Sequence, residues 1–174
     1  MTSILKVSEI QDPTNGNSAL TIDSSGRILQ PSKPAFSVYQ STTLSSQDYT
    51  SDTKVPFDTK DFDIGNNVTL NSSAVFTAPI NGIYHFSCSV MLNSVEISNF
   101  MSLNLFIDDA PVNSANDLSY RYLEDNQGGN YQTGKSSGLI QLTANQTVTP
   151  YVRAIDDTSV SLRDGARFFG YLVA

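Results

Sequence analysis

The chain has 174 residues and a mass of 18.9 kDa, which allows one compact domain with a short extension and excludes two large domains. Its formal net charge of -7, without any local basic patch, excludes a general affinity for the phosphate backbone of nucleic acids. Ser, Thr and Asn are abundant, and these residues favour turns over helices. We therefore expect an all-β protein made of short strands and many turns.

Cysteine content and apolar runs restrict the class of protein further. Cys88 is the only cysteine, which excludes an internal disulfide. The first residues lack the basic region and the apolar stretch of a secretory signal, so we expect no cleaved export signal. The longest apolar run, residues 168–174, is much shorter than the ~20 residues that span a bilayer, so we expect no membrane insertion.

The N-terminal part of the chain has few apolar side chains. Strand-like runs at Ile4–Ile10 and Ala19–Ile22 are separated by turn sequences. Such a segment cannot build a hydrophobic core, so it must pack against another chain, another protein or the rest of this one. Gln30–Pro34 contains two prolines, which disfavour helix and predict an extended connector. We therefore divide the chain into an extended N-terminal segment, residues 1–33, and a main domain, residues 34–174.

Alternation of apolar and polar residues dominates the main domain. Apolar side chains occupy every second position from Met101 to Ile107, as expected of a half-buried strand. Turn sequences, such as Asn81 with Gly82 and residues 125–130, fall between the alternating runs. Roughly eight or more short strands, with a turn about every 8–12 residues, favour an antiparallel sandwich of the jelly-roll kind.

Two predicted strands, residues 84–92 and 168–174, are apolar on both faces. A sandwich strand normally keeps one face in water, so a strand that is apolar on both sides implies a second buried surface. The simplest such surface is a subunit interface, and the last strand is expected to lie centrally in its sheet. We predict that five side chains contribute to the interface: Tyr84, His85, Phe86, Phe169 and Tyr171.

Catalytic and zinc sites lack the residues that they need. His85 is the only histidine, and Cys88 lies three residues further along the same predicted strand, on its opposite face. The two side chains therefore cannot form a nucleophile and base pair, and a zinc site would need more ligands of this kind. We expect no enzymatic activity, no catalytic residues and no bound cofactor.

Clustered carboxylates leave two alternatives open. Asp58, Asp61 and Asp63 lie close together in the sequence, and two Asp-Asp pairs follow at 108–109 and 156–157. Calcium accepts oxygen ligands from such loops, although none of them fits a 12-residue EF-hand loop. The second alternative is a pair of carboxylates for glycoside hydrolysis. Such a pair is defined by the distance between the two carboxyl groups in the folded protein, so the sequence leaves this alternative open.

A polar loop rich in tyrosine is the best candidate for contact with a ligand. Tyr120, Tyr122 and Tyr131 surround the adjacent glycines at 128 and 129, without the lysine or following helix that phosphate binding would need. Tyrosines in loops are typical of contact surfaces. We predict that these three side chains face a ligand.

Spacing in the main domain resembles the signature of the C1q-domain family. The matching positions are Phe57, Asp63, Val68, Phe76, Gly82, Tyr84 and Phe86. The run from Phe76 to Phe86 is the most specific part, and the resemblance covers about residues 34–174. It implies a C1q/TNF-like jelly roll that assembles as a tight homotrimer, with inner sheets meeting around a threefold axis. Some C1q-like heads bind calcium.

The N-terminal segment looks like the opening segment of many structural and fibre proteins of marine tailed phages, including cyanophages. Residues 3–12 and 19–26 carry this resemblance. It implies a chain that attaches to a virus particle and projects a trimeric head, so the expected location is the virion. The predicted particle anchor consists of the apolar side chains of the segment: Ile4, Leu5, Val7, Ile10, Leu20 and Ile22.

Together these features predict a non-enzymatic virion structural protein of a tailed phage. The expected partners are two further copies of the chain, capsid or tail proteins bound through the N-terminal segment, and a glycan or protein of the host surface. The alternative is a secreted C1q-like recognition protein that binds carbohydrates or microbial surfaces. The lack of a signal peptide and of a collagen-like stalk disfavours that alternative.

Overall fold

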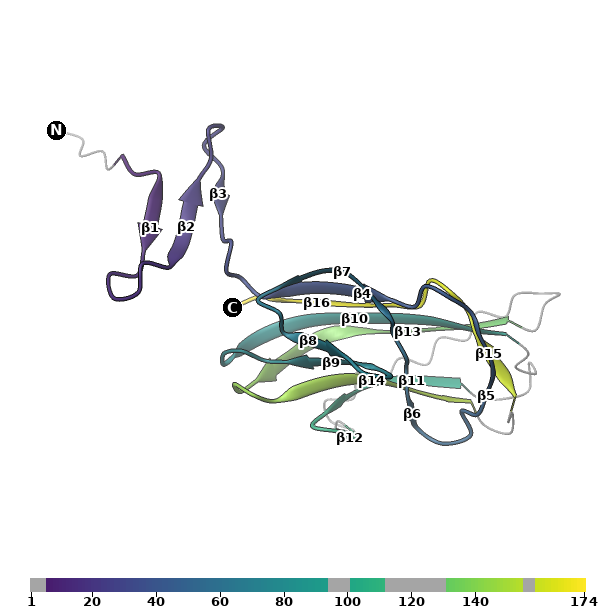
Figure 1. Cartoon of the computed structure of the whole chain (residues 1–174). Coiled ribbons are helices and arrows are strands. Elements are labelled where there is room, and N and C mark those ends of the chain that lie inside the picture. Colours follow the sequence, from purple (N-terminus) through teal and green to yellow (C-terminus); the bar gives the residue numbers. More distant parts are fainter. Residues whose placement is uncertain (1–5, 94–100, 112–130, 155–158) are drawn as a thin grey trace.

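The computed structural model describes residues 6–93, 101–111, 131–154 and 159–174. In this part of the chain the regular secondary structure consists of strands only. These strands pair antiparallel in three sheets. Two sheets stack as a sandwich, here named the head (residues 34–174), and the third is a small separate sheet near the N-terminus (Figure 1). A search of the described residues found no helix that could cross a membrane.

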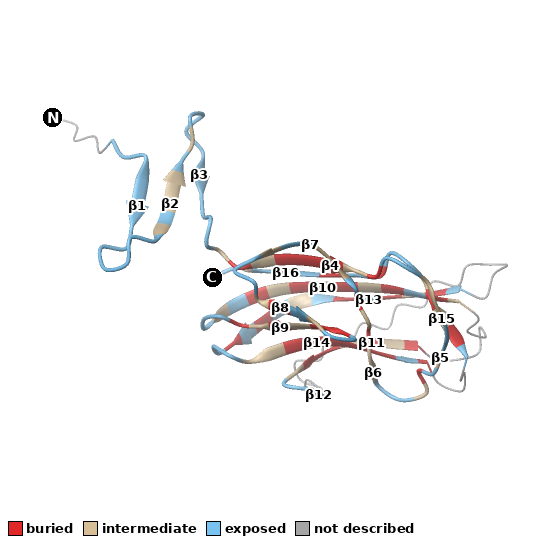
Figure 2. Ribbon diagram, in the orientation of Figure 1, coloured by how far each residue is buried: buried red, intermediate tan, exposed pale blue. Residues whose placement is uncertain are grey.

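The small sheet, here named the N-terminal sheet, contains β1 (Glu9–Gln11), β2 (Ser18–Ile22) and β3 (Ile28–Leu29). Aspartates close its two turns. The Asp12 carboxylate accepts the N–H of Thr14 at 2.7 Å, and the Asp23 carboxylate accepts the N–H of Arg27 at 2.9 Å. None of the residues from β1 to β3 is buried (Figure 2). The segment predicted to be extended is thus a folded meander, but it has no core of its own.

The larger sheet of the sandwich has seven strands: β4 (Ala35–Tyr39), β5 (Leu44–Gln47), β7 (Thr59–Ile64), β10 (Gly82–Asn93), β13 (Tyr131–Leu142), β15 (Val160–Leu162) and β16 (Arg167–Leu172). β10 pairs with β13 on one side and with β16 and β15 on the other. Beyond β16 come β4 and β7. The last strand of the chain therefore lies centrally in its sheet, as its two-sided apolar pattern predicts.

The second sheet has six strands: β6 (Thr53–Lys54), β8 (Val68–Leu70), β9 (Ala74–Thr77), β11 (Met101–Ile107), β12 (Ala110–Pro111) and β14 (Thr147–Ala154). Its order is β12-β11-β14-β9-β8, with β6 beside β14. In β11 the buried positions include Met101, Leu103 and Leu105, which follow the predicted alternation. The two stacked antiparallel sheets confirm the predicted all-β jelly-roll sandwich.

Aromatic side chains from both layers fill the core of the head. The ring centroid of Phe36 lies 5.2 Å from that of Phe76 and 4.9 Å from that of Phe168. Gly170 leaves room for these rings, because a Cβ at this position would fall 2.5 Å from Cδ1 of Phe86 and 2.9 Å from Cε1 of Phe36. Such packing requires a glycine in the middle of β16.

Tyr84 and Phe86 belong to this core. Both are 0% exposed, and the Tyr84 hydroxyl donates to the Ile80 carbonyl at 2.9 Å. Their prediction as subunit-interface residues is therefore wrong, since neither side chain reaches the surface of the chain. The error has a physical cause: β10 carries large side chains on both faces, so its sequence does not say which face turns inward.

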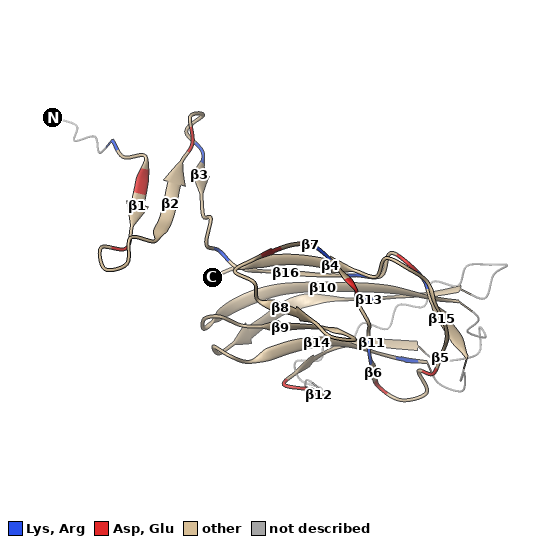
Figure 3. Cartoon of the chain, viewed as in Figure 1, with Lys and Arg blue, Asp and Glu red and all other residues tan. Residues whose placement is uncertain are grey.

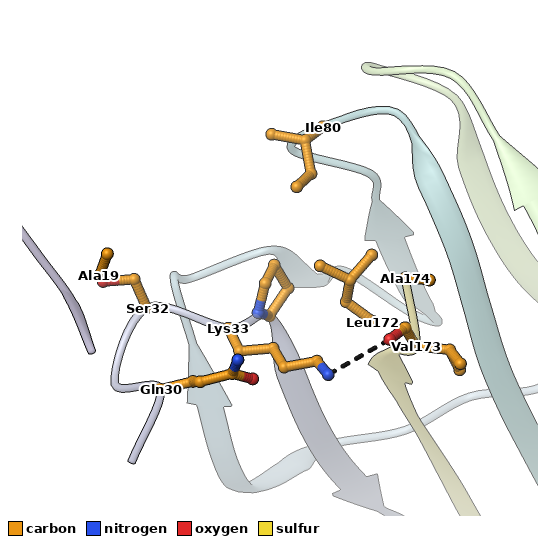
Figure 4. Close-up of a pocket in the computed structure, with 9 residues that line it drawn as sticks. Ala19, Gln30, Ser32, Lys33, Ile80, Leu172, Val173 and Ala174 are labelled. Carbon is orange, nitrogen blue, oxygen red and sulfur yellow. Dashed lines mark hydrogen bonds between the residues drawn. The ribbon is translucent and has the colours of Figure 1, made fainter. Parts of the chain in front are cut away.

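One end of the head holds both the connector from the N-terminal sheet and the C-terminus of the chain (Figure 1). The Leu172 N–H donates to the Pro34 carbonyl at 2.9 Å, and the Lys33 ammonium donates to the Val173 carbonyl at 3.4 Å (Figure 4). An open pocket of about 320 Å³ lies here between the connector and the head, with Ile80 on its far side. The connector is thus attached to the end of β16.

Candidate functional site

The side chains of β10 that point away from the core form a continuous surface with their neighbours on β16 and β13. In the sheet register His85 lies between Tyr171 of β16 and Leu139 of β13. Directly paired residues of a sheet point to the same side, so these rows form one surface, here named the outer face. It comprises Ile83, His85, Ser87, Ser89 and Met91 of β10, Arg167, Phe169 and Tyr171 of β16, and Thr133, Lys135, Ser137, Leu139 and Gln141 of β13.

A group of large side chains occupies the middle of the outer face. His85, Leu139, Phe169 and Tyr171 form it, and they are named here the outer apolar cluster. Leu139 is 60% exposed, Tyr171 45% and Phe169 37%. The His85 ring centroid lies 5.1 Å from that of Tyr171 and 6.3 Å from that of Phe169. Contiguous exposed apolar surface of this kind is typical of sites where proteins associate.

Three of the five predicted interface residues therefore lie together on one exposed surface: His85, Phe169 and Tyr171. Leu139 was missed by the sequence-based interpretation, although it is the most exposed member of the cluster. Its strand contains many Ser and Gly residues, so the alternation that marks β10 and β16 is weak there. The role of the cluster in subunit association remains a prediction.

Within the described part of the chain, His85 contacts a hydroxyl but no carboxylate. Its Nε2 atom lies 3.2 Å from Oγ of Ser137, which is 52 residues away in the sequence. Its Nδ1 atom is buried and has no hydrogen-bond partner among the described residues. A catalytic Ser-His pair needs a third group that orients the imidazole through Nδ1. No such third group is present among the described residues.

A polar group borders the apolar cluster on the side of β4. The Arg167 guanidinium is paired with the Asp61 carboxylate and donates to Oγ of Ser37 at 3.0 Å. It also lies over the ring of Tyr39, 5.4 Å from the centroid. These contacts fix the Arg167 side chain beside the apolar cluster.

Cys88 faces the opposite direction from His85, as the alternation of β10 predicts. Its side chain is 1% exposed and belongs to the core. Burial raises the pKa of the Cys88 thiol, because the thiolate would be desolvated. A thiol of this kind is structural and unreactive.

The carboxylates suggested for calcium are bound by protein donors where the structure describes them. Asp63 accepts the N–H groups of Asn67 at 2.9 Å and Val68 at 3.0 Å, and Asp61 pairs with Arg167. Asp58 accepts the Ser41 hydroxyl, which holds the pKa of Asp58 below its usual value.

The other carboxylate pairs are also engaged or lie outside the described residues. Asp108 accepts the N–H of Thr147, and the Lys54 ammonium lies 2.8 Å from Asp109. These contacts lower the pKa of both aspartates. Residues 156–157 lie outside the described part of the chain. Among the described residues, no group of three or more His, Cys, Asp or Glu side chains could hold a metal ion.

Only one of the three tyrosines proposed to face a ligand is described. Tyr131 is exposed at the start of β13, whereas Tyr120 and Tyr122 lie outside the described residues. Tyr131 pairs with Asn93 at the end of β10, and Gly82 at the other end of β10 lies beside the C-terminus. Over this length a strand spans roughly 36 Å. Tyr131 therefore lies at the opposite end of the head from the connector.

The predicted particle anchor is partly described. Ile4 and Leu5 lie outside the described residues. Val7 is exposed ahead of β1, Ile10 lies in β1, and Leu20 and Ile22 lie in β2. Ile10 and Leu20 are paired in the register, so they share one face of the N-terminal sheet. Attachment to a particle through these side chains remains a prediction.

Comparisons with known proteins agree with this architecture. The C1q domain model matches residues 35–173. Among solved structures, the globular domain of the zebrafish complement 1qA protein has 20% sequence identity and a TM-score of 0.56, over 82% of this chain and 98% of that chain. Murine APRIL has 14% identity and a TM-score of 0.52, over 81% and 98%. Eiger TNF from S. frugiperda has 12% identity and a TM-score of 0.52, over 82% and 94%.

At these identities the three structures show likeness of fold alone. No curated protein matches the sequence. Trimers are typical of the matched family, and its members are generally not enzymes. Because the family model covers far more than half of the sequence, the chain belongs to the C1q-domain family and has its all-β C1q/TNF fold.

Proposed function

We propose that this chain is a non-enzymatic structural protein of a tailed-phage virion, in which three copies form an appendage. The heads associate through their outer faces, and the N-terminal segments attach the appendage to the capsid or tail. The opposite end of the head is free to contact the host surface. The outer apolar cluster is the observation on which the proposal depends most.

Association through the outer face would remove the exposed side chains of the cluster from water. Fully burying one large apolar side chain stabilises a protein by about 1.5–3 kcal/mol. Leu139, Phe169 and Tyr171 are 60%, 37% and 45% exposed, so burying their remaining surface would contribute about 1 kcal/mol each, and a closed trimer uses each of them three times. The polar border formed by Arg167 and Asp61 fits the rim of an interface, where charged groups stay in contact with water.

The positions of the two ends of the head support an appendage. The connector joins the head at Pro34, beside the end of β16, whereas Tyr131 lies at the far end of the β10–β13 pair. A particle held at the first end would therefore present the second end outward. Three identical contact surfaces in one appendage increase avidity without strong individual contacts. The virion assignment itself depends on the resemblance of residues 3–12 and 19–26 to phage structural proteins.

An enzymatic role has little support from the described residues. His85 has no carboxylate partner among the residues that the structure describes, and Cys88 is buried on the other side of β10. The described aspartates near the outer face and the turns are engaged by protein donors. Binding and assembly require no cofactor, so the proposed function requires none.

The mass in solution tests the trimer first. Light scattering of the full chain and of residues 31–174 should give about three times the monomer mass for both. A monomeric head would contradict assembly through the outer face. The truncated chain should retain its fold, because none of the described residues before Pro34 is buried.

Incorporation tests the virion role. Mass spectrometry of purified phage particles should detect the full chain, and residues 31–174 expressed in its place should be absent from the particles. Normal incorporation of the truncated chain would exclude the N-terminal segment as the anchor. A trimer that is absent from particles but binds carbohydrates or bacterial surfaces would instead indicate the alternative function, a C1q-like recognition protein.

A further inference from the structure

The N-terminal sheet has two chemically different faces. In its register Ile10 lies opposite Leu20, and Ile22 lies opposite Ile28. Leu20 and Ile22 are two residues apart on β2, so all four side chains lie on one face. With Glu9 they line a shallow pocket of about 80 Å³. These four residues are here named the aliphatic face.

The opposite face has a different composition. Thr21 is paired with Glu9 on one side and with Leu29 on the other. Two of these three side chains are polar, whereas all four on the aliphatic face are Ile or Leu. The N-terminal sheet is therefore amphipathic, like a sheet that packs one face on a second layer.

No second layer covers the aliphatic face in the described part of the chain. Ile28 is 67% exposed, and Ile22 is 39% exposed. In Figure 2 no part of β1, β2 or β3 has the colour of buried residues. The three strands have only three, five and two residues, so a second layer on the apolar face would stabilise this sheet. The aliphatic face is thus the surface on which the N-terminal sheet needs a partner.

The point at which the connector meets the head indicates which partner is nearest. Pro34 and Lys33 bond to the backbone of Leu172 and Val173, directly after the strand that carries Phe169 and Tyr171. In a trimer formed through the outer face, three connectors would leave the heads beside the threefold axis and at the same end. Three N-terminal sheets would therefore lie next to one another.

Charge favours contact between copies of the N-terminal segment. Residues 1–33 contain three cationic and three anionic side chains, in a chain whose formal net charge is -7. Lys6, Arg27 and Lys33 balance Glu9, Asp12 and Asp23, and Arg27 is paired with Asp23 at 2.6 Å. Figure 3 shows both signs in the N-terminal segment, with the three acidic residues lying between basic residues along the chain. Copies of this segment therefore repel one another much less than the remainder of the chain does.

We propose that the aliphatic face is a self-association surface, on which the other two copies of this chain form the missing layer. Three N-terminal sheets turn Ile10, Leu20, Ile22 and Ile28 toward one axis and form a trimeric stalk. This inference rests on the trimer of the proposed function. Ile10, Leu20 and Ile22 then contact other copies rather than the particle, and the assembled stalk attaches as a unit.

A pair of single-cysteine additions in the full chain tests the stalk. Ile22→Cys places a thiol on the aliphatic face, and Thr21→Cys places one on the opposite face of the same strand. The native Cys88 is buried and is common to both variants. Under mild oxidation Ile22→Cys should yield covalently linked pairs of chains, and Thr21→Cys should not. The new thiol of Ile22→Cys should also react with a thiol reagent at about one tenth of the rate of the Thr21→Cys thiol, or more slowly, because burial limits access to the thiolate.

Ile10→Cys, on the neighbouring strand, repeats the test if Ile22→Cys does not fold. Equal reactivity of the two thiols in a chain whose residues 31–174 form trimers would overturn the stalk and leave the proposed trimer intact. Protection of Ile22→Cys only after addition of purified particles would also overturn it, because the aliphatic face would then belong to a particle protein. A monomeric head would instead contradict the proposed function itself.

Discussion

The head and the N-terminal sheet are both antiparallel β-structure, yet they differ in what covers their apolar faces. In the head each sheet lies on the other, and the rings of Phe36, Phe76 and Phe168 are almost completely buried. In the N-terminal sheet Ile22 and Ile28 stay more than a third exposed. Strand pairing alone therefore does not bury apolar surface, and a second layer is required. Where the chain does not supply that layer, we expect another copy to do so.

The outer face of the head is an intermediate case. β10 buries Tyr84 and Phe86 against the second sheet, while its own outer-face side chains Ile83 and Met91 remain exposed. The inner face of β10 is thus covered by the second sheet, whereas its outer face is exposed in the single chain. Substitutions on the two sides should have different consequences, for folding on the inner side and for assembly on the outer side.

The largest expected effect is the loss of a core ring. Phe86→Ala should lower the free energy of unfolding by about 3–5 kcal/mol, because it leaves a cavity between the two layers. Chemical denaturation at a fixed protein concentration measures it. Ser87→Ala, on the outer face, is the matched control and should change stability by less than ~1 kcal/mol. Equal losses in the two variants would contradict the assignment of the two faces.

A charge on the outer apolar cluster should separate assembly from folding. Tyr171→Asp should give a folded monomer, because each copy loses about 1 kcal/mol of ring burial and gains a desolvated carboxylate. Light scattering reports the mass, and circular dichroism reports the fold. Thr69→Asp places the same charge on the exposed side of β8 in the second sheet and should leave the trimer intact. A trimer that survives Tyr171→Asp would argue against the outer face as the interface.

Gly170→Ala tests how closely the rings pack on β16. The added Cβ would meet Phe86 and the His85 carbonyl oxygen, the latter at 2.9 Å. We expect a loss of about 1–3 kcal/mol, as for other overpacked cores. Thermal unfolding measures the change, and an unaltered transition would show that the core is looser than these distances indicate.

The smallest expected effect concerns the turn between β11 and β12. The N–H of Thr147 lowers the pKa of Asp108 in the folded protein. The contribution of Asp108 is therefore present above the unfolded-state pKa of about 3.9 and is lost as the pH falls through the lower folded-state pKa. Asn tolerates the left-handed φ of 51° at this position, so Asp108→Asn should keep the turn.

The measurement for this variant compares two pH values. At pH 7 Asp108→Asn should cost about 0.5–1.5 kcal/mol, the value of one hydrogen bond. As the pH falls from 7 towards 2, the difference between the wild-type and variant stabilities should shrink, since the wild-type carboxyl then becomes protonated. A difference that grows on acidification would contradict the assigned role of Asp108.

The sequence supplied the fold class because alternation and turn residues are local properties. The pattern from Met101 to Ile107 predicts a half-buried strand, and β11 occupies those residues. The last strand was expected to be central, and β16 lies between β10 and β4. Leu139 and Ser137 could not be assigned to the outer face in this way, because only long-range pairing brings β13 beside β10.

Which face of a strand is buried is the feature that the sequence predicted least well. Both faces of β10 carry large side chains, and the hydrophobic pattern has the same period whichever face turns inward. The prediction therefore placed Tyr84 and Phe86 in the interface together with His85, and the structure separates them. Ile28 was likewise missing from the predicted anchor, because only its pairing with Ile22 places it on the aliphatic face.

The amino-acid sequence by itself determined that this protein is made of short antiparallel strands, that its N-terminal segment has no core of its own, and which residues resemble the C1q signature. These properties follow from the order of residues along a strand and from composition. Only the tertiary structure decided which face of β10 is buried, and which distant residues complete the outer apolar cluster and the aliphatic face. That decision depends on strand register and layer packing, which join residues far apart in the chain.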